Sequence, residues 1–193
     1  MKVDLKKQHF ALLFLLFAIN SNSQTVYQTN DGEKTKSKPT FLQFDFSIPL
    51  TGNPDRDVVD PYTHEKGYWF IPDGLNAIVG FGIHKNQWLA IGINSGINWK
   101  ITEKLVAVPV FGSLKISPKL SKNDETRIFI AIGFGKSFAL GRGNLSGNYR
   151  KISIGIETDD HIALFLELSE HGLKYNNFNT VPSVSVGISI TRF

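Results

Sequence analysis

The chain has 193 residues, with 15 phenylalanines, one methionine, no cysteine and a formal net charge of +4 at pH 7. The lack of cysteine excludes disulfides, thiolate metal sites and cysteine nucleophiles. Residues 1–23 contain three lysines and one aspartate, so only +2 of the charge belongs to residues 24–193. This near-neutral balance gives no electrostatic reason to expect a nucleic-acid partner.

The first 23 residues have the pattern of an export signal. Lys2, Lys6 and Lys7 precede the apolar run Phe10–Ile19, and the small polar residues Ser21–Ser23 follow it. This apolar run is about half of the roughly 20 residues that a helix needs to cross hydrocarbon. The pattern therefore favours a cleaved signal peptide over a membrane anchor, with cleavage near Ser23.

Residues 24–39 contain little that could be buried, so we expect a flexible periplasmic leader there and one domain over residues 40–193. From residue 41 onward, apolar and small polar residues alternate with a period of two, which is typical of β-strands. A tight turn is expected at Lys85-Asn86, and Pro109 predicts a bulge. The pattern predicts eight strands, at residues 41–50, 75–84, 87–99, 105–117, 127–138, 149–158, 161–170 and 183–193.

The two faces of these strands differ in a way that indicates a membrane. One face is almost continuous Ile, Leu, Val and Phe, and the other is mostly Gly, Ala, Ser and Asn with few charges. A soluble barrel would carry many charged residues on the face that meets water, and an open sheet edge in lipid would leave backbone groups unpaired. The sequence therefore predicts an all-β fold, an eight-stranded antiparallel up-and-down transmembrane β-barrel.

The lengths of the connections predict the orientation. Residues 51–74, 139–148 and 171–182 are long, whereas Lys85-Asn86 and Asp159-Asp160 are short. Such barrels combine long outer loops with short periplasmic turns, so both termini are expected in the periplasm. Two connections do not follow this rule, since residues 100–104 are short for an outer loop and residues 118–126 are long for a turn.

Several motifs resemble those of the small outer-membrane β-barrel family of Gram-negative bacteria. They are the signal end Ser21-Asn-Ser-Gln24, the strands with Gly80-Phe-Gly82 and Gly133-Phe-Gly135, and the ending Gly187–Phe193. The resemblance implies insertion by the barrel-assembly machinery, contact with outer-membrane lipid and lipopolysaccharide, and no common enzymatic activity. In that family the terminal Phe shares the apolar face, so Phe193 would need a bulge near Thr191 to be in phase.

Charged residues on the small-residue face are expected to lie inside the barrel. An eight-stranded barrel leaves room only for side chains, and buried charges must be paired. The favoured interpretation is an ion-pair network that fills the interior, and the alternative is a binding or catalytic constellation. The residues that face inward by parity are Asp45, His84, Lys115, Lys151, Glu157 and Glu167.

The segment from Glu167 to His171 also resembles the site region of lipid A deacylases, which are eight-stranded barrels with a Ser, a His and an acidic residue. A serine nucleophile needs a base within hydrogen-bond reach and a third group that orients the base. Here Ser169, His171 and Glu167 are the candidates, but the order of Ser and His is the reverse of the family pattern. A polar strand end that enters a loop remains the favoured interpretation.

The sequence thus predicts a non-enzymatic outer-membrane barrel that has a structural role or binds an unidentified surface or periplasmic protein through its outer loops. It predicts no large-solute channel, no cofactor and no metal site. Residues 51–73 are the best candidate for a recognition surface, because they include the ionisable residues Asp55, Arg56, Asp57, Asp60, His64, Glu65 and Lys66. The alternatives are a lipid A-modifying hydrolase and a soluble periplasmic lipocalin-like carrier.

Overall fold

The computed structural model describes residues 39–59, 62, 64–120, 126–141, 145–158, 161–173 and 180–193. The predicted signal peptide and residues 24–38 of the predicted leader lie outside the described residues. Within the described part of the chain, no helix is long and apolar enough to cross a membrane.

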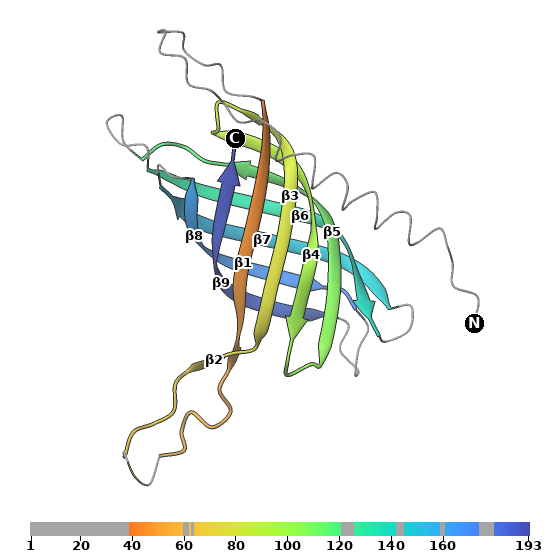
Figure 1. The fold of residues 1–193 in the computed structure, drawn as a ribbon. Coiled ribbons are helices and arrows are strands. Elements are labelled where there is room, and N and C mark those ends of the chain that lie inside the picture. Colours follow the sequence, from red (N-terminus) through yellow and green to blue (C-terminus); the bar gives the residue numbers. More distant parts are fainter. Residues whose placement is uncertain are drawn as a thin grey trace, which may run out of the picture. The chain divides into compact units, whose positions relative to one another are not determined.

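Eight long antiparallel strands form a closed wall (Figure 1). Each strand pairs with the one before it, and the last strand pairs back with the first through nine residue pairs, from Leu42–Arg192 to Leu50–Val184. This closure confirms the predicted fold class. The strands of the wall are β1 (Thr40–Gly52), β3 (Gly74–Lys85), β4 (Leu89–Lys100), β5 (Leu105–Ile116), β6 (Arg127–Leu140), β7 (Ser146–Glu157), β8 (Ile162–His171) and β9 (Val181–Arg192).

A further short strand, β2 (Phe70–Pro72), was not predicted from the sequence. It pairs with the end of β1, from Leu50–Pro72 to Gly52–Phe70, and so extends that hairpin past the wall. Three residues are too few to show a period of two, which explains why the pattern gave no signal there. Figure 1 shows β2 beyond the lower end of the barrel.

The predicted bulge at Pro109 is wrong. The register between β5 and β6 is unbroken from Val106–Leu140 to Ile116–Ile130. Pairing with β4 stops after Ser95–Val110 and resumes at Asn98–Ala107 in the same register. Proline has no N–H to donate, and here it removes rungs of the ladder without adding a residue to the strand.

The turn between β3 and β4 is one residue longer than predicted and spans residues 86–88. The N–H of Trp88 donates to the carbonyl of Lys85, and the two residues between them, Asn86 and Gln87, have φ values of 50° and 62°. Two consecutive positive φ values are the feature of a type I′ turn, which matches the twist of a β-hairpin.

The aliphatic face points away from the barrel axis, as the sequence predicted. Ile91, Ile130, Ile154 and Leu166 are between 44% and 57% exposed, whereas the residues that alternate with them are buried or half-buried. In water such a continuous aliphatic surface would promote aggregation, so it requires an apolar surrounding. The wall is therefore built for contact with acyl chains.

The interior is so narrow that inward aromatic rings need glycines opposite them on neighbouring strands. Four phenylalanines point inward, and each ring lies over a glycine on a neighbouring strand. A Cβ at these glycines would lie only 2.6 to 2.8 Å from the ring. The pairs are Phe41 with Gly82, Phe111 with Gly133, Phe129 with Gly155 and Phe165 with Gly187.

The terminal Phe193 also lies on the inner face. The register between β1 and β9 contains no bulge, so the phase of β9 continues to the end of the strand. The ring centroid of Phe193 lies 4.6 Å from that of His84 and 4.8 Å from that of His161, in edge-to-face geometry. Phe193 therefore helps to fill the barrel at the end where the chain terminates.

We predict that Gly155→Ala destabilises the barrel and that Gly112→Ala does not. A Cβ at Gly155 would meet the carbonyl oxygen of Leu164 and lie 2.6 Å from the Phe129 ring, whereas at Gly112 the nearest atom is 3.9 Å away. Overpacking of this kind costs about 1–3 kcal/mol. The measurement is urea unfolding of the protein refolded in lipid vesicles, and equal stability of the two variants would contradict the prediction.

Candidate functional site

Charged side chains are concentrated inside the barrel. Of the six residues that the sequence assigned to the interior, five are buried by more than 90%, and His84 is half-buried beside Phe193. The five are Asp45, Lys115, Lys151, Glu157 and Glu167.

The first ion pair joins β5 to β7 across β6. Lys115 Nζ lies 2.6 Å from Glu157 Oε2, and both side chains are at most 10% exposed. The second oxygen of Glu157, Oε1, lies 3.6 Å from Nδ1 of His161. Lys115 Nζ also lies 4.5 Å from the ring centroid of Phe129, a cation–π distance.

The second ion pair joins β7 to β8 and reaches β1. Lys151 Nζ lies 2.7 Å from Glu167 Oε2 and 3.7 Å from Asp45 Oδ2. The side-chain amide of Gln43 donates a hydrogen bond of 2.7 Å to Asp45 Oδ1. One lysine is therefore shared by two carboxylates, one of which has a further donor, as buried charges require.

The two lysines of these ion pairs, Lys115 and Lys151, line a small cavity of about 20 Å³ together with Asp45. This is room for one or two water molecules and for no larger solute. Each of these charged groups lies near one of opposite sign, and the side chains fill the interior around the cavity. It offers no free charged group to bind an ion or a substrate.

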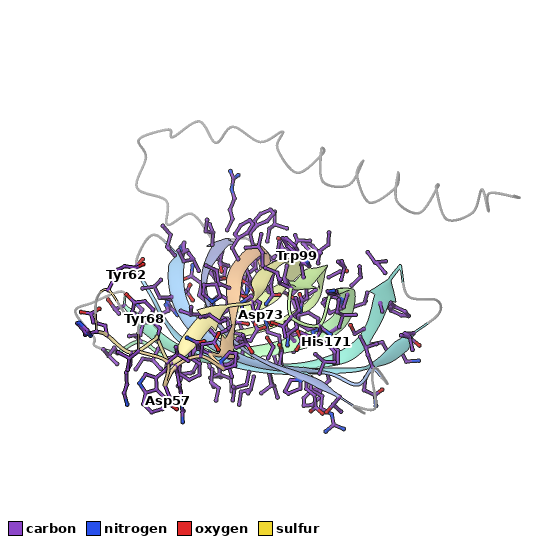
Figure 2. All side chains as sticks on the ribbon, turned by 90° about the horizontal axis from the view of Figure 1, so that it is seen from below. Asp57, Tyr62, Tyr68, Asp73, Trp99 and His171 are labelled. Carbon is purple, nitrogen blue, oxygen red and sulfur yellow. The ribbon has the colours of Figure 1, made fainter. Side chains whose placement is uncertain are left out.

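His171 lies inside the barrel at the end opposite Phe193, which we call the loop end. Two neighbouring side chains hold its ring. Ser137 Oγ lies 2.8 Å from Nδ1 of this ring, and the amide nitrogen of Asn98 lies 3.2 Å from Nε2. Figure 2 labels His171 among the side chains. With that amide donating to Nε2, the neutral ring carries its proton on Nδ1 and donates it to Ser137. In this tautomer the ring does not accept the proton of the Ser137 hydroxyl.

Two of the three candidate catalytic residues, His171 and Glu167, are held by other side chains. Ser169 and His171 share the inner face of β8, but both ring nitrogens of His171 are engaged by Asn98 and Ser137, and Glu167 is paired with Lys151. Ser137 was missed because it lies 34 residues from His171, and only the register of the strands brings the two together. Ser137 and His171 are almost fully buried and lie on the inner face of the barrel.

Apolar residues close the interior at the loop end. A buried cluster is formed by Leu105, Ala107, Ala139, Leu173 and Val181, with Leu145 packed against it. Beside it, Lys100 Nζ donates a hydrogen bond of 2.6 Å to the carbonyl of Pro182. The interior is thus occupied by side chains from the loop end to Phe193, and little space is left for a ligand.

The connection between β1 and β3 carries the most prominent exposed aromatic residues. Tyr62 and Tyr68 are 92% and 85% exposed, and Figure 2 labels both. The guanidinium of Arg56 lies 4.8 Å from the ring centroid of Trp69. We call Arg56, Tyr62, Tyr68, Trp69 and Phe70 the loop surface.

Asp73 fixes the base of this connection. Its N–H donates to the carbonyl of Pro49 at 2.8 Å, and its carboxylate accepts a hydrogen bond of 2.8 Å from the N–H of Thr102. The side chain of Asp73 thereby ties the end of the long connection to the short one between β4 and β5. Sequence reasoning placed Asp73 in the loop but gave it no role.

We predict that Glu157→Gln lowers the free energy of unfolding by about 3–5 kcal/mol, because it leaves Lys115 as an unpaired buried charge. The double variant Lys115→Met with Glu157→Gln should recover much of this loss. Arg56→Gln, which breaks an exposed ion pair with Asp57, is the control and should change little. Urea unfolding in lipid vesicles measures all three, and a double variant less stable than Glu157→Gln would contradict the prediction.

Comparison with known proteins supports the architecture. No protein-family model and no curated protein sequence matches the chain significantly. Neisserial surface protein A is similar in structure, with a TM-score of 0.50 and 8% identity over 79% of this chain and 97% of that protein.

Two further solved structures are similar at lower scores. A de novo designed transmembrane β-barrel has a TM-score of 0.42 and 15% identity, over 81% of this chain and 98% of that one. The attachment invasion locus protein Ail of Yersinia pestis has a TM-score of 0.37 and 8% identity, over 79% of this chain and 97% of that one. At 8% identity, the likeness to Neisserial surface protein A bears on the fold alone. The chain has the eight-stranded transmembrane β-barrel fold of small outer-membrane proteins.

Proposed function

We propose that the protein is an integral outer-membrane barrel without enzymatic activity, which binds a partner on the cell surface through its outer loops. The observation that carries this proposal is the contrast between a filled interior and the exposed aromatic loop surface. Residues 1–23 would act as the export signal, with cleavage near Ser23, and residues 24–39 as a periplasmic leader. Insertion would be the task of the barrel-assembly machinery.

The loop surface supports a binding role because aromatic and arginine side chains dominate the energetics of protein interfaces. Tyr68, Trp69 and Phe70 are consecutive, and all are more than 60% exposed. Exposed apolar residues that are contiguous in this way are a feature of interaction sites. A filled interior, by contrast, supports no transport of large solutes.

The filled interior also argues against the hydrolase alternative. A lipid A hydrolase must present its serine to a substrate that lies in the membrane, whereas Ser137, Ser169 and His171 are buried on the inner face. The carrier alternative conflicts with the aliphatic outer wall, which water would not tolerate.

Single cysteines test the location and the orientation, because the chain has no cysteine of its own. In intact cells, Tyr62→Cys should react with a membrane-impermeant maleimide. Leu120→Cys, which is 62% exposed in the connection between β5 and β6, should react only after the outer membrane is permeabilised. If Leu120→Cys alone is labelled in intact cells, the orientation is the opposite of the one proposed. If carbonate extracts the protein from membranes, the membrane location is refuted.

We predict that Tyr68→Ser with Trp69→Ser reduces the retention of expressing cells on glycan and protein arrays by roughly tenfold or more, since hot-spot aromatics contribute about 2 kcal/mol or more each. The control is Leu120→Ser, which changes an exposed residue at the other end of the barrel. Surface labelling and heat-modifiable migration on gels should show equal amounts of folded protein. Equal retention of the two variants and the wild type would remove the loop surface from the proposal.

A further inference from the structure

The long connection between β1 and β3 returns to the wall through a β-bulge. On β1, two residues lie between the paired positions Ser47 and Leu50, whereas three residues lie between their partners Asn76 and Pro72. The extra residue falls in the segment 73–75. β1 itself is regular, because it pairs with β9 in unbroken register. An extra residue on one strand of an antiparallel pair re-aims the side chains that follow it.

The bulge determines which face of the hairpin carries each ring of the loop surface. Residues that are directly opposite in an antiparallel pair share a face. Phe70 is opposite Gly52, which by alternation lies on the face that continues the outer wall. The carbonyl of Trp69 accepts a hydrogen bond from the N–H of Asn53, so Trp69 lies on the face that continues the interior, which we call the axial face. Without the extra residue, the alternation from Leu75 would place these two rings the other way round.

Gly74 and Asp73 give the bulge its geometry. Gly74 has a φ of 139°, which L side chains rarely adopt, and a Cβ there would meet the backbone carbonyl of Trp99. Asp73 is 3% exposed, and its carbonyl accepts a hydrogen bond of 2.9 Å from the N–H of Ile101. Asp73 thus contacts β1 through its N–H, and it contacts the connection between β4 and β5 through its carbonyl and its carboxylate.

The ring that the bulge turns to the axial face is the one on which an arginine stacks. The guanidinium of Arg56 lies over the Trp69 ring, which is still 70% exposed. Tryptophan and arginine are enriched among the residues that dominate the energetics of protein interfaces. On the axial face, the pair is turned away from the lipid side of the wall.

We propose that Asp73 and Gly74 are positioning residues of the loop surface. The bulge that they form turns Trp69, with Arg56 stacked on it, to the axial face, and the Asp73 carboxylate holds this arrangement on the connection between β4 and β5. The inference deepens the proposed binding role of the loop surface and rests on that role for its functional meaning. The position of the Trp69 ring can be measured without a partner, so the two proposals are tested separately.

Fluorine NMR of protein that contains fluorotryptophan tests the carboxylate. The chain has three tryptophans, and Trp69→Phe identifies the signal of Trp69. In Asp73→Ala this signal should shift toward its value in the unfolded protein, because the acceptor for the Thr102 N–H is lost. Asp73→Asn keeps an acceptor oxygen and should retain the wild-type signal. The matched control is Asp55→Ala, which removes an exposed carboxylate from the same connection, and Trp88 at the other end of the barrel is the internal reference.

Deletion of Gly74 tests the bulge, because it removes the extra residue and should exchange the two faces of the hairpin. The protein is refolded in phosphatidylcholine vesicles in which some lipids carry a nitroxide on the headgroup, which broadens the signals of rings turned toward the membrane. The Trp69 signal should be broadened more in this variant than in the wild type. Deletion of Asp55 leaves Gly52 opposite Phe70, so it should give the wild-type broadening.

Retention of expressing cells on glycan and protein arrays connects the position of the ring to binding. Asp73→Ala should lower retention by roughly fivefold or more, because the entropy of ordering Trp69 and Arg56 is then lost on binding. Asp73→Asn should restore retention, and heat-modifiable migration shows that each variant is folded. Unchanged retention of Asp73→Ala on an array that holds the wild type would refute the functional part of the proposal.

Three NMR results would overturn the positioning role. They are an unchanged Trp69 signal in Asp73→Ala, an equal change in Asp55→Ala or at Trp88, and equal broadening of Trp69 in the wild type and the Gly74 deletion. If Asp73→Asn behaves like Asp73→Ala, the role of the acceptor oxygen is wrong. If wild-type cells are held on no array, the proposed binding role fails, while the Trp69 signals still show whether the bulge positions the ring.

Discussion

Closure of the hydrogen-bond ladder between β1 and β9 is the constraint on which the rest of the structure depends. In an apolar surrounding every backbone N–H and C=O needs a partner within the protein, since each unpaired group costs several kcal/mol. The nine pairs from Leu42–Arg192 to Leu50–Val184 give the two terminal strands that partner. Once the ladder is closed, each side chain of the wall points either inward or outward.

The small diameter that follows from eight strands then determines the interior. Rings such as Phe129 and Phe165 occupy space that a Cβ on Gly155 or Gly187 would otherwise need. The remaining volume is taken by ion pairs, which are tolerated only because Lys115 and Lys151 each contact a carboxylate. Among the described residues, the space beside these ion pairs is a cavity of only about 20 Å³, and this is why we assign the proposed binding to the loops.

The period of two was enough to predict the wall but not the contacts inside it. Ile91 and Ile154 are on the outer face as expected, because the parity of a strand depends on local sequence alone. The partners of Lys115 and His171 come from strands that lie 42 and 34 residues away. Which residues meet depends on the register between strands, and a single sequence does not specify the register.

Irregular backbone was the second limit of sequence reasoning. Pro109 suggested a bulge, but the strand keeps its register and only loses rungs of the ladder. Phe193 would have needed a bulge to join the outer face, and without one it packs between His84 and His161. In both cases the alternation of faces, maintained by pairing on both sides of the strand, outweighs the preference of one residue.

The connection between β1 and β3 is partly fixed by contacts of its own, and this affects the affinity with which the loop surface would bind a partner. Binding through a flexible loop loses affinity, because each side chain that becomes ordered costs conformational entropy. Here Asp73 ties the base of the connection to Thr102, β2 extends the hairpin, and Arg56 stacks on Trp69. These contacts order part of the surface before a partner arrives, so less entropy is lost on binding. The contacts that hold this connection against the wall would therefore favour the proposed recognition by the loop surface.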